Sequence, residues 1–337
     1  MPVRVPPGSH QTTVVDNFSG ANDLGCRDSR DPKCQTAIVE RGAELELEFK
    51  LRNMIFEHLA KQVADKGTLT RSELSAFPIG GRTQRLIDQN RGIWNPRDFA
   101  ATLSIMSQPD SPYDDAELDD STFIYSYRDG STDGDNRKLR NAYEWHLPLI
   151  LLRWIKGGVY VPVFPVYVIH DDVERRRFVL ALDERLFDAE DPVHLKPIER
   201  SYAQTINRKR LHQPEFRGRI MTAYGNKCSV CRLGHRQLLD AAHITPDSDD
   251  HGTPELENGL CLCKLHHSAY DTNLIGISPD YQVVIGKALL DSHDESPLVQ
   301  HGFLPFDRQT LAVPKSSRQR PSPERLGKRY AVFKAAS

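Results

Sequence analysis

Cysteines and histidines gather in the stretch "GLCLCKLHHSAYD" at positions 259–271. Within it, Cys263 and His266 are separated by two residues, a spacing that lets two side chains bind one tetrahedral ion. A second pair with the same spacing, Cys228 and Cys231, lies upstream in "GNKCSVCRLGHR". One such pair is a weak signal, but two pairs together are a strong one. We therefore predict that these four residues bind a structural Zn²⁺ ion.

Three further polar residues lie between these pairs or directly after them in the sequence. His243 ends the strand-like run "LLDAAHITP", Asn258 lies in "ELENGL", and His267 directly follows His266 and must point elsewhere. A histidine with a pKa near its ordinary value of about 6.5 can take a proton from water at neutral pH. A histidine outside the zinc pairs is therefore a candidate general base or metal ligand.

The order His243, Asn258, His267 inside a C-x2-C…C-x2-H frame resembles the HNH nucleases, which have a ββα-metal fold. The resemblance covers roughly residues 213–285. It implies that His243 is the general base and that His267 binds a catalytic divalent ion, Mg²⁺, Mn²⁺ or another. It also implies that Asn258 orients the loop that carries the base.

The sequence departs from one common form of the motif immediately before the general base. Many HNH enzymes have an acidic residue or histidine there as a second metal ligand, whereas this chain has Ala242. Asp271, one helical turn after His267, is the substitute that we favour, and Asp240 is its rival. The alternative for Asp271 is an ordinary surface acid.

The other cysteines and the lengths of the apolar runs indicate the cellular compartment of the protein. Cys261 is separated from Cys263 by one residue, a spacing that chelates poorly, so we expect a buried thiol. Cys26 and Cys34 have no histidine neighbours and are expected to be free thiols. Such clustered cysteines favour metal binding in a reducing compartment over a disulfide framework. With no apolar run near the ~20 residues of a membrane span and no signal core, we expect a cytoplasmic protein.

Charge is segregated along the chain, although its net value is only −2. Residues 200–236 hold nine Lys or Arg against one acid, and residues 308–337 hold eight against one. Residues 110–135 show the reverse, with nine acids against one arginine. Such segregation can give one domain a positive face toward nucleic acid, and the alternative is solvated loops and a solubilising tail.

The order of predicted helices and strands indicates an α+β chain. Residues 43–64 carry Leu45 and Leu59 at helical spacing, and "TRSELSAF" predicts a short helix with Thr70 as N-cap and Glu73 completing a capping box. The predicted parts are a poorly ordered arm over 1–40, a recognition domain over 41–195, a linker or connecting helix over 196–212, an HNH nuclease domain over 213–312 and a basic tail over 313–337.

The recognition domain is predicted to be a mixed, mainly β barrel after its helical start. The runs "FAATLSIM", "TFIYSYR", "VYVPVFPVYVIHD" and "RRFVLALD" are rich in β-branched and aromatic residues. Between them, "NRKLRNAYEWHLPLILL" is predicted to be the one helix. The whole segment from Gly92 to Ile169 resembles the PUA/SRA-like barrels of modification-dependent restriction enzymes, which flip a modified base into a pocket.

That resemblance implies a pocket with aromatic faces for stacking and polar groups for the base edge. For each candidate residue, the alternative is a turn acid or a tyrosine of the barrel core. The candidates are Trp94, Tyr113, Asp114, Tyr125, Tyr127, Asp135 and Asn136.

Our leading hypothesis is a type IV-like restriction endonuclease that reads modified cytosine and cuts double-stranded DNA. Because a duplex needs two cuts, we expect a homodimer at least on DNA, and no membrane partner. One alternative is an HNH endonuclease that reads unmodified sequence or phosphorothioate DNA. Another is a zinc-stabilised DNA-binding module, inactive because Ala242 removes a metal ligand.

Overall fold

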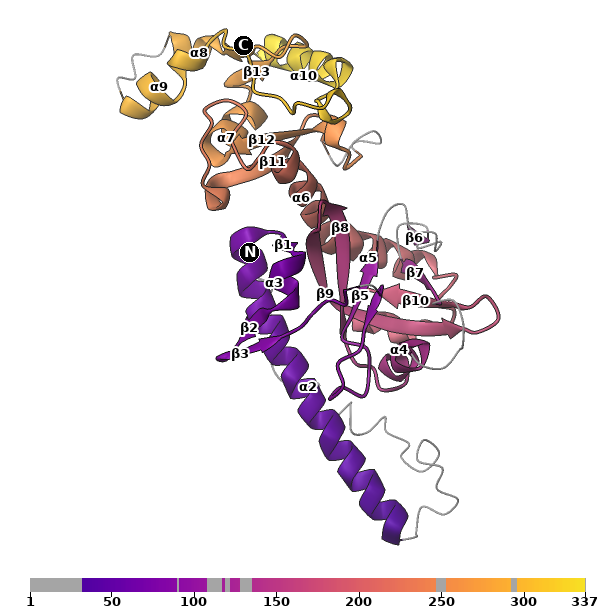
Figure 1. Cartoon of the computed structure of the whole chain (residues 1–337). Helices are drawn as coiled ribbons and strands as arrows, with labels where there is room; N and C mark the ends of the chain where they lie inside the picture. Colours follow the sequence, from indigo (N-terminus) through magenta and orange to yellow (C-terminus); the bar gives the residue numbers. More distant parts are fainter. Residues whose placement is uncertain are drawn as a thin grey trace. The chain divides into compact units, whose positions relative to one another are not determined.

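The computed structural model describes residues 32–89, 91–107, 117–118, 122–127, 135–246, 253–291 and 296–336 (Figure 1). The chain divides into two compact units, Met1–Leu211 and His212–Ser337, which are taken separately below. Several predictions fall outside the described part. They are most of the N-terminal arm (residues 1–31), the side chains of Cys26, Cys34 and Asp135, and the base-pocket candidates Tyr113 and Asp114.

Unit 1 begins with the long helix α2, Pro32–Lys66. The sequence pattern placed its start at position 43, because apolar residues at helical spacing begin only at Leu45. Leu45, Ile55 and Leu59 are buried. The helix therefore starts inside the segment that was predicted to be an arm, with a proline at the first position, where its missing N–H costs no hydrogen bond.

The short helix predicted by the capping box is confirmed as α3, Arg71–Ser75. The Thr70 hydroxyl accepts from the Glu73 N–H, and the Glu73 carboxylate accepts from the Thr70 N–H at 2.8 Å. The strand β1, Leu69–Thr70, precedes this helix, and the hairpin β2, Phe77–Ile79, and β3, Arg82–Gln84, follows it.

The rest of unit 1 is a curled, mixed sheet with strand order β4-β5-β8-β9-β10-β7-β6, and β1 pairs with β9. β5 and β8 are parallel, and the other neighbours are antiparallel. Together with unit 2, this sheet confirms the predicted α+β class. The strands are β4, Ile93–Trp94; β5, Ser104–Ser107; β6, Glu117–Leu118; β7, Thr122–Ser126; β8, Leu149–Lys156; β9, Val159–Asp172; and β10, Arg177–Ala181.

The prediction of one helix through "NRKLRNAYEWHLPLILL" is wrong in its second half. Helix α4 spans only Asp135–Glu144, and Leu149–Leu152 lie in the central strand β8 between β5 and β9. Pro148 disfavours helical backbone at the residue before it, and His146 has a φ of +50°. A strand buried on both faces gives a continuous apolar run, which periodicity cannot distinguish from a buried helix.

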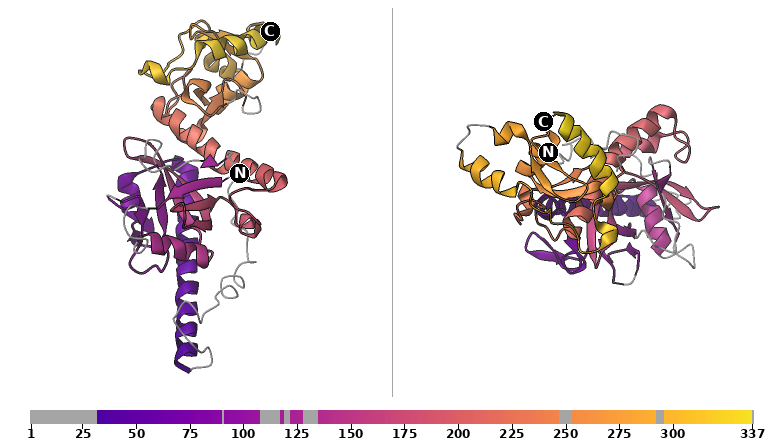
Figure 2. Two further views of the ribbon diagram at one scale, coloured as in Figure 1. Left: turned by 90° about the vertical axis from the view of Figure 1, so that its right-hand side faces the viewer. Right: turned by 90° about the horizontal axis from the view of Figure 1, so that it is seen from above.

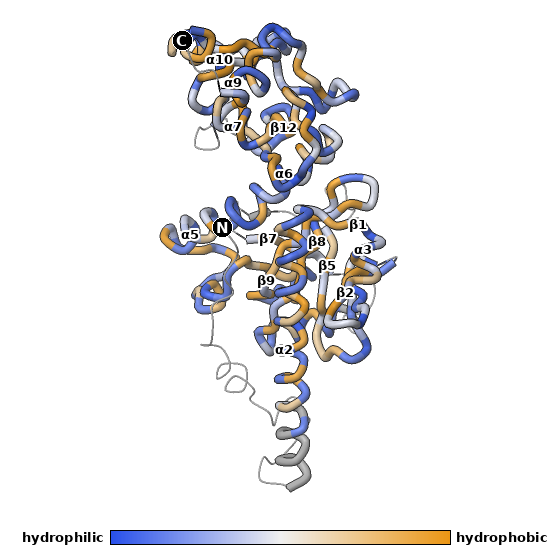
Figure 3. The backbone as a smooth tube through the Cα atoms, turned by 90° about the vertical axis from the view of Figure 1, so that its left-hand side faces the viewer, coloured by the Kyte–Doolittle hydropathy of each residue, from blue (hydrophilic) through white to orange (hydrophobic). Residues whose placement is uncertain are grey.

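Alternate residues of β8 enter two different hydrophobic clusters, as the two faces of a strand require. Leu149 and Leu151 pack with residues of α4 and β10, whereas Ile150 and Leu152 pack with Ile55 and neighbouring residues of α2. Figure 3 shows the same concentration of apolar residues along β5, β8 and β9. The helix and the sheet therefore share a core.

A buried ion pair also ties α2 to the sheet. Arg52 is fully buried, is paired with Glu48, and donates to the backbone carbonyls of Ala101, Thr102 and Pro148. Breaking such a pair leaves an uncompensated buried charge, which is strongly destabilising. Nothing in the apolar pattern of α2 pointed to this contact.

A helical run follows the sheet, visible in the two further views of Figure 2. After the short helix η1, Glu184–Asp188, it consists of α5, Pro197–Asn207, the wider turns of η2, Arg208–His212, and α6, Gln213–Ala223. Of the two alternatives for residues 196–212, a linker or a connecting helix, the structure shows the helix, from Pro197 onward.

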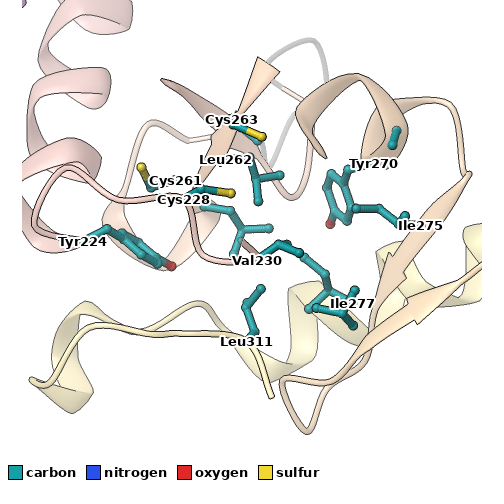
Figure 4. Close-up of a cluster of buried hydrophobic side chains, with 14 of the residues drawn as sticks. Tyr224, Cys228, Val230, Cys261, Leu262, Cys263, Tyr270, Ile275, Ile277 and Leu311 are labelled. Atoms are coloured by element: carbon teal, nitrogen blue, oxygen red, sulfur yellow. The ribbon is translucent and has the colours of Figure 1, made fainter. Parts of the chain in front are cut away.

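Unit 2 is built around the antiparallel pair β11, Leu239–His243, and β12, Gly259–Cys263, followed by α7, Lys264–Asp271. Its core includes Tyr224, Val230, Leu262, Ile275 and Leu311 (Figure 4). The remaining elements are η3, Arg236–Leu238; η4, Leu256–Asn258; β13, Ile275–Ile277; β14, Val283–Ile285; α8, Lys287–Leu290; α9, Pro297–Gly302; η5, Leu304–Phe306; η6, Ser317–Gln319; and α10, Pro323–Ala336.

The segment predicted to be a basic tail ends in helix α10, which packs on β13. Leu326 and Phe333 of α10 are buried. A Cβ atom at Gly276 of β13 would lie 2.4 Å from the Phe333 ring, so the close packing requires glycine there. Residues 323–336 are thus part of the folded unit. In the described part of the chain, every helix is too short or too polar to cross a membrane.

Candidate active site and zinc cluster

The structure brings Cys228, Cys231, Cys263 and His266 together, with their ligand atoms all within 4.8 Å of one another. The first two lie in the loop after α6, Cys263 ends β12, and His266 lies in the first turn of α7. Three sulfurs and an imidazole nitrogen at this separation fit one tetrahedral Zn²⁺ ion. In the described part of the chain, this is the only such group of possible metal ligands.

The contacts around the cluster favour metal binding. The Nδ1 atom of His266 lies 3.0 Å from the Cys263 sulfur, and its Nε2 donates to the Gly302 carbonyl at 2.9 Å. The carbonyl fixes the tautomer and leaves Nδ1 free for an ion. Hydrogen bonds from Cys231 and Cys263 lower the pKa of the Cys228 thiol, and the same contacts raise the pKa of Cys263, so the cluster without an ion holds a thiolate at Cys228 and a thiol at Cys263. Gly302 was not among the predicted site residues, because nothing in the sequence links it to the cluster.

Cys261 is buried, as expected, beside the Met221 sulfur at 3.6 Å. Burial raises the pKa of its thiol to about 12. Cys261 and its neighbour Leu262 on β12 both belong to the core of unit 2 (Figure 4). A thiol that stays protonated is a poor metal ligand.

His243 ends β11, opposite Gly259 at the start of β12. Its half-buried ring stacks on Phe216 of α6, with the ring centres 4.1 Å apart and the planes 15° from parallel. A Cβ atom at position 259 would lie 2.2 Å from Ile220 and 2.8 Å from Phe216. The glycine therefore lets α6 approach the two strands closely enough to hold the His243 ring.

Asn258 is fully buried and closes the loop between β11 and β12. Its side-chain oxygen accepts from the Thr245 N–H at 2.8 Å, and its amide donates to the carbonyls of Thr245 and Thr253 at 3.1 and 3.0 Å. Its own carbonyl accepts from Ile244, the residue after His243, at 2.9 Å. This one side chain therefore fixes the backbone immediately after the histidine.

His267 lies between the two acids that could replace the missing metal ligand. Its Nε2 is 3.4 Å from the Asp271 carboxylate, and its Nδ1 is 3.7 Å from the Asp240 carboxylate. Asp240 also accepts from Arg217 at 3.1 Å. Contact with His267, and then with Arg217, lowers the pKa of Asp240, and Asp240 in turn raises the pKa of His267.

The described base-pocket candidates of unit 1 do not form one site. Trp94 packs against the α2 side of the sheet and donates to the Arg85 carbonyl, whereas Tyr125 and Tyr127 belong to the cluster on the other face. Both tyrosines and Asn136 are buried. Their placement favours the barrel-core alternative over base stacking.

One hydrogen-bonded group in unit 1 lies beside an open cavity. The Tyr127 hydroxyl donates to Asp171 and accepts from Arg140 at 3.0 Å. Asp171 also lines a pocket of about 460 Å³, together with His170, Asp172 and His194. The sequence did not identify this cavity, because its lining comes from the β9–β10 turn and the segment before α5.

Residues 228–278, which include the zinc cluster, β11, β12 and α7, match the HNH_2 family model, described as HNH endonuclease. This segment is an HNH endonuclease domain. The HNH domain is the catalytic part of a metal-dependent nuclease, and its match covers neither unit 1 nor α10. No curated protein matches the chain.

Solved structures similar to the whole chain include two restriction endonucleases. A structure titled "Modification dependent TagI restriction endonuclease" is similar to it with a TM-score of 0.25 and 17% identity, covering 77% of this chain and 89% of that one. A structure of the "Type IV phosphorothioation-dependent restriction endonuclease ScoMcrA" has a TM-score of 0.22 and 13% identity, covering 54% and 48%.

Proposed function

We propose that this protein is a restriction endonuclease that cuts double-stranded DNA with its HNH domain and reads modified cytosine with unit 1. The observation that carries the nuclease chemistry is the position of His243, Asn258 and His267 around the β11–β12 hairpin and α7. HNH domains cut DNA with little sequence preference, so we assign recognition to unit 1.

His243 is the general base of the proposed reaction. It takes a proton from the attacking water while Phe216 and Asn258 hold the ring and the backbone that carries it. A ring held in this way can face only a narrow range of water positions, which is what an in-line attack on phosphorus requires.

His267 and Asp271 are the proposed ligands of the catalytic divalent ion, Mg²⁺, Mn²⁺ or another. Carboxylate oxygen suits Mg²⁺ and Mn²⁺, imidazole nitrogen suits transition-metal ions, and Nε2 and the Asp271 oxygen already lie 3.4 Å apart. When bound, such an ion supplies positive charge beside the scissile phosphate and the leaving 3′-oxygen.

Asp240 has a different proposed role, because it lies on the Nδ1 side of the His267 ring. The two nitrogens of an imidazole point away from each other, so an ion on Nε2 beside Asp271 is remote from Asp240. Asp240 instead faces Nδ1, where a carboxylate fixes the tautomer and the ring orientation. Arg217 holds this carboxylate in turn. The geometry therefore supports Asp271 as the ligand and Asp240 as a positioning residue.

The proposed recognition of modified cytosine rests on the separate folded unit 1 and on the chemistry of its polar cavity. Carboxylates and histidines can hydrogen-bond the amino group and ring nitrogen of a base edge, and acids outnumber arginines in the lining of this cavity. The Tyr127–Asp171–Arg140 group keeps one wall of this cavity ordered. Because a duplex needs two cuts, two copies of the chain are expected to act together on DNA.

The test is the cleavage of two plasmids of identical sequence, one unmodified and one carrying methylated or hydroxymethylated cytosine, with Mg²⁺ and then with Mn²⁺. Cleavage of the modified plasmid alone would support the proposal. Equal cleavage of both plasmids would retain the HNH chemistry but remove the modified-base reader. A plasmid with phosphorothioate linkages is the third substrate, and its exclusive cleavage would assign the reader to the backbone instead.

A further inference from the structure

We propose that helix α10 is a clamp that positions the catalytic groups, with Arg329 holding the end of α7 and Arg325 holding the loop that Asn258 closes. The inference rests on the proposed roles of Asp271 and Asn258. It concerns residues outside the HNH match, which ends at position 278.

Arg329 contacts the last turn of α7, where Asp271 is the final residue. One guanidinium nitrogen donates to the Tyr270 carbonyl and lies 3.5 Å from the Asp271 carbonyl. The other donates to the side-chain oxygen of Asn273, and the guanidinium lies 4.7 Å from the centre of the Tyr270 ring. One planar side chain therefore holds both sides of the turn that follows Asp271.

The backbone closes the end of α7, since the N–H groups of Asn273 and Leu274 donate to the carbonyls of Tyr270 and Ala269, and Arg329 adds a second donor to the Tyr270 carbonyl. Asn273 has a φ of +58° and reverses the chain directly after the helix. Asp271 reaches the Nε2 atom of His267 only while the final turn stays helical, because the two residues are four positions apart. A cation at a helix C-terminus also interacts favourably with the helix dipole.

Arg325 contacts the second half of the site. It donates to the Thr253 hydroxyl at 3.2 Å and lies 3.6 Å from the Glu255 carboxylate. The N–H of Ser322, just before α10, donates to the Glu257 carbonyl at 2.9 Å. Asn258 binds the carbonyl of the same Thr253, so the helix holds the end of the loop that Asn258 ties to the residues after His243.

The two arginines can act together because they lie four positions apart, on one face of α10. Leu326 and Phe333 anchor this helix in the core of unit 2. Lys328, in contrast, is exposed and pairs only with exposed Glu324. It offers a matched control with the same charge on the same helix.

The test measures Mn²⁺ binding to the zinc-loaded full chain by calorimetry, together with zinc content, melting temperature and DNA cleavage. R329Q is expected to weaken Mn²⁺ binding by about 10–100-fold, the usual effect of removing a group that orients a metal ligand. K328Q is expected to bind Mn²⁺ as the wild type does. R325Q is expected to keep the Mn²⁺ affinity but to lower kcat about 10–100-fold, since it displaces the loop next to the base.

Wild-type Mn²⁺ affinity in a folded R329Q, or an equal loss in K328Q, would overturn the clamp at α7. Wild-type kcat in R325Q would overturn the clamp at the loop. If R329Q loses zinc or melts early, N273G decides: glycine adopts the same positive φ readily and removes only one acceptor of Arg329. N273G should bind Mn²⁺ more weakly, and unchanged affinity would overturn the inference.

H267A separates a failure of this inference from a failure of the proposed function. If H267A binds Mn²⁺ as tightly as the wild type, the proposed ion site itself is wrong. If H267A loses the ion while R329Q and N273G retain it, only the clamp is wrong.

Discussion

His266 and His267 are adjacent in sequence, yet they serve different groups. The Nδ1 atom of His266 lies 3.0 Å from the Cys263 sulfur, whereas the Nε2 atom of His267 lies 3.4 Å from the Asp271 carboxylate. Successive residues of a helix point about 100° apart, so α7 can present one histidine to a structural ion and the next to the proposed catalytic one. Within one helical turn, His266 therefore serves the structural zinc site and His267 serves the proposed catalytic site.

C228S should lose zinc and unfold unit 2, because a structural zinc ion contributes folding free energy directly. Zinc content and a thermal melt measure this. The matched control is C261A, which removes a neighbouring buried thiol that binds no ion and should retain full zinc content. A zinc-free C228S protein with a wild-type melt would contradict the assignment.

D271N and D240N should differ, since one removes a proposed ligand and the other a group that orients the ligand. D271N is expected to raise the Mn²⁺ concentration needed for half-maximal cleavage more strongly than D240N does. Removing a group that orients a metal ligand, as D240N does, typically lowers metal affinity about 10–100-fold. The measurement is a metal titration of plasmid nicking. A larger effect in D240N would exchange the two roles.

Metal binding should depend on pH through His267. Contact with Asp240 raises the pKa of His267 above its ordinary value of 6.5. Metals bind the unprotonated ring, so affinity should rise with pH, by up to about tenfold per unit, until the pH exceeds that raised pKa. D240N lowers the pKa again and should move the rise to lower pH. Calorimetric Mn²⁺ titrations across the range measure the midpoint, and an unmoved midpoint in D240N would show that Asp240 does not set it.

L326A should destabilise unit 2 by about 2–5 kcal/mol, the usual effect of removing a buried leucine side chain. The result follows from the packing of α10 on β13, where Leu326 is fully buried. Chemical denaturation followed by far-ultraviolet circular dichroism measures the loss in free energy of unfolding. V332A is the control on the same helix, because Val332 is 55% exposed. Equal stability of L326A and V332A would indicate that residues after 313 are a loose tail after all.

The four residues of the zinc cluster could be predicted to lie together because metal chelation favours short spacings between ligands. Pairs separated by two residues show this pattern without any tertiary structure. The contacts of Asn258 with Thr245 and Thr253 agree with the loop-closing role that the HNH resemblance implied. The choice between Asp240 and Asp271 could not be made in this way, because it depends on which ring nitrogen faces which acid.

The errors came where tertiary packing overrides local pattern. The apolar run of β8 was taken for helix because a strand buried on both faces has no alternation. In α10 the many basic residues favoured the prediction of a tail, although two apolar residues seven positions apart, Leu326 and Phe333, are buried. Pro323 at the helix start and this seven-residue spacing were the signals that could have identified the helix. The part played by Arg329 could not be foreseen, since its partners lie more than fifty residues away in sequence.

The most direct test of the account is metal-dependent plasmid nicking by the wild type and by H243A, each checked for zinc content and DNA binding. The account predicts nicking by the wild type with Mn²⁺ or Mg²⁺ on modified plasmid, and a loss of about 10²–10⁴-fold in H243A, the usual share of a general base. DNA binding and zinc content should be unchanged. Wild-type nicking rates in a folded H243A, or the absence of metal-dependent nicking by the wild type on any of the three plasmids, would contradict it.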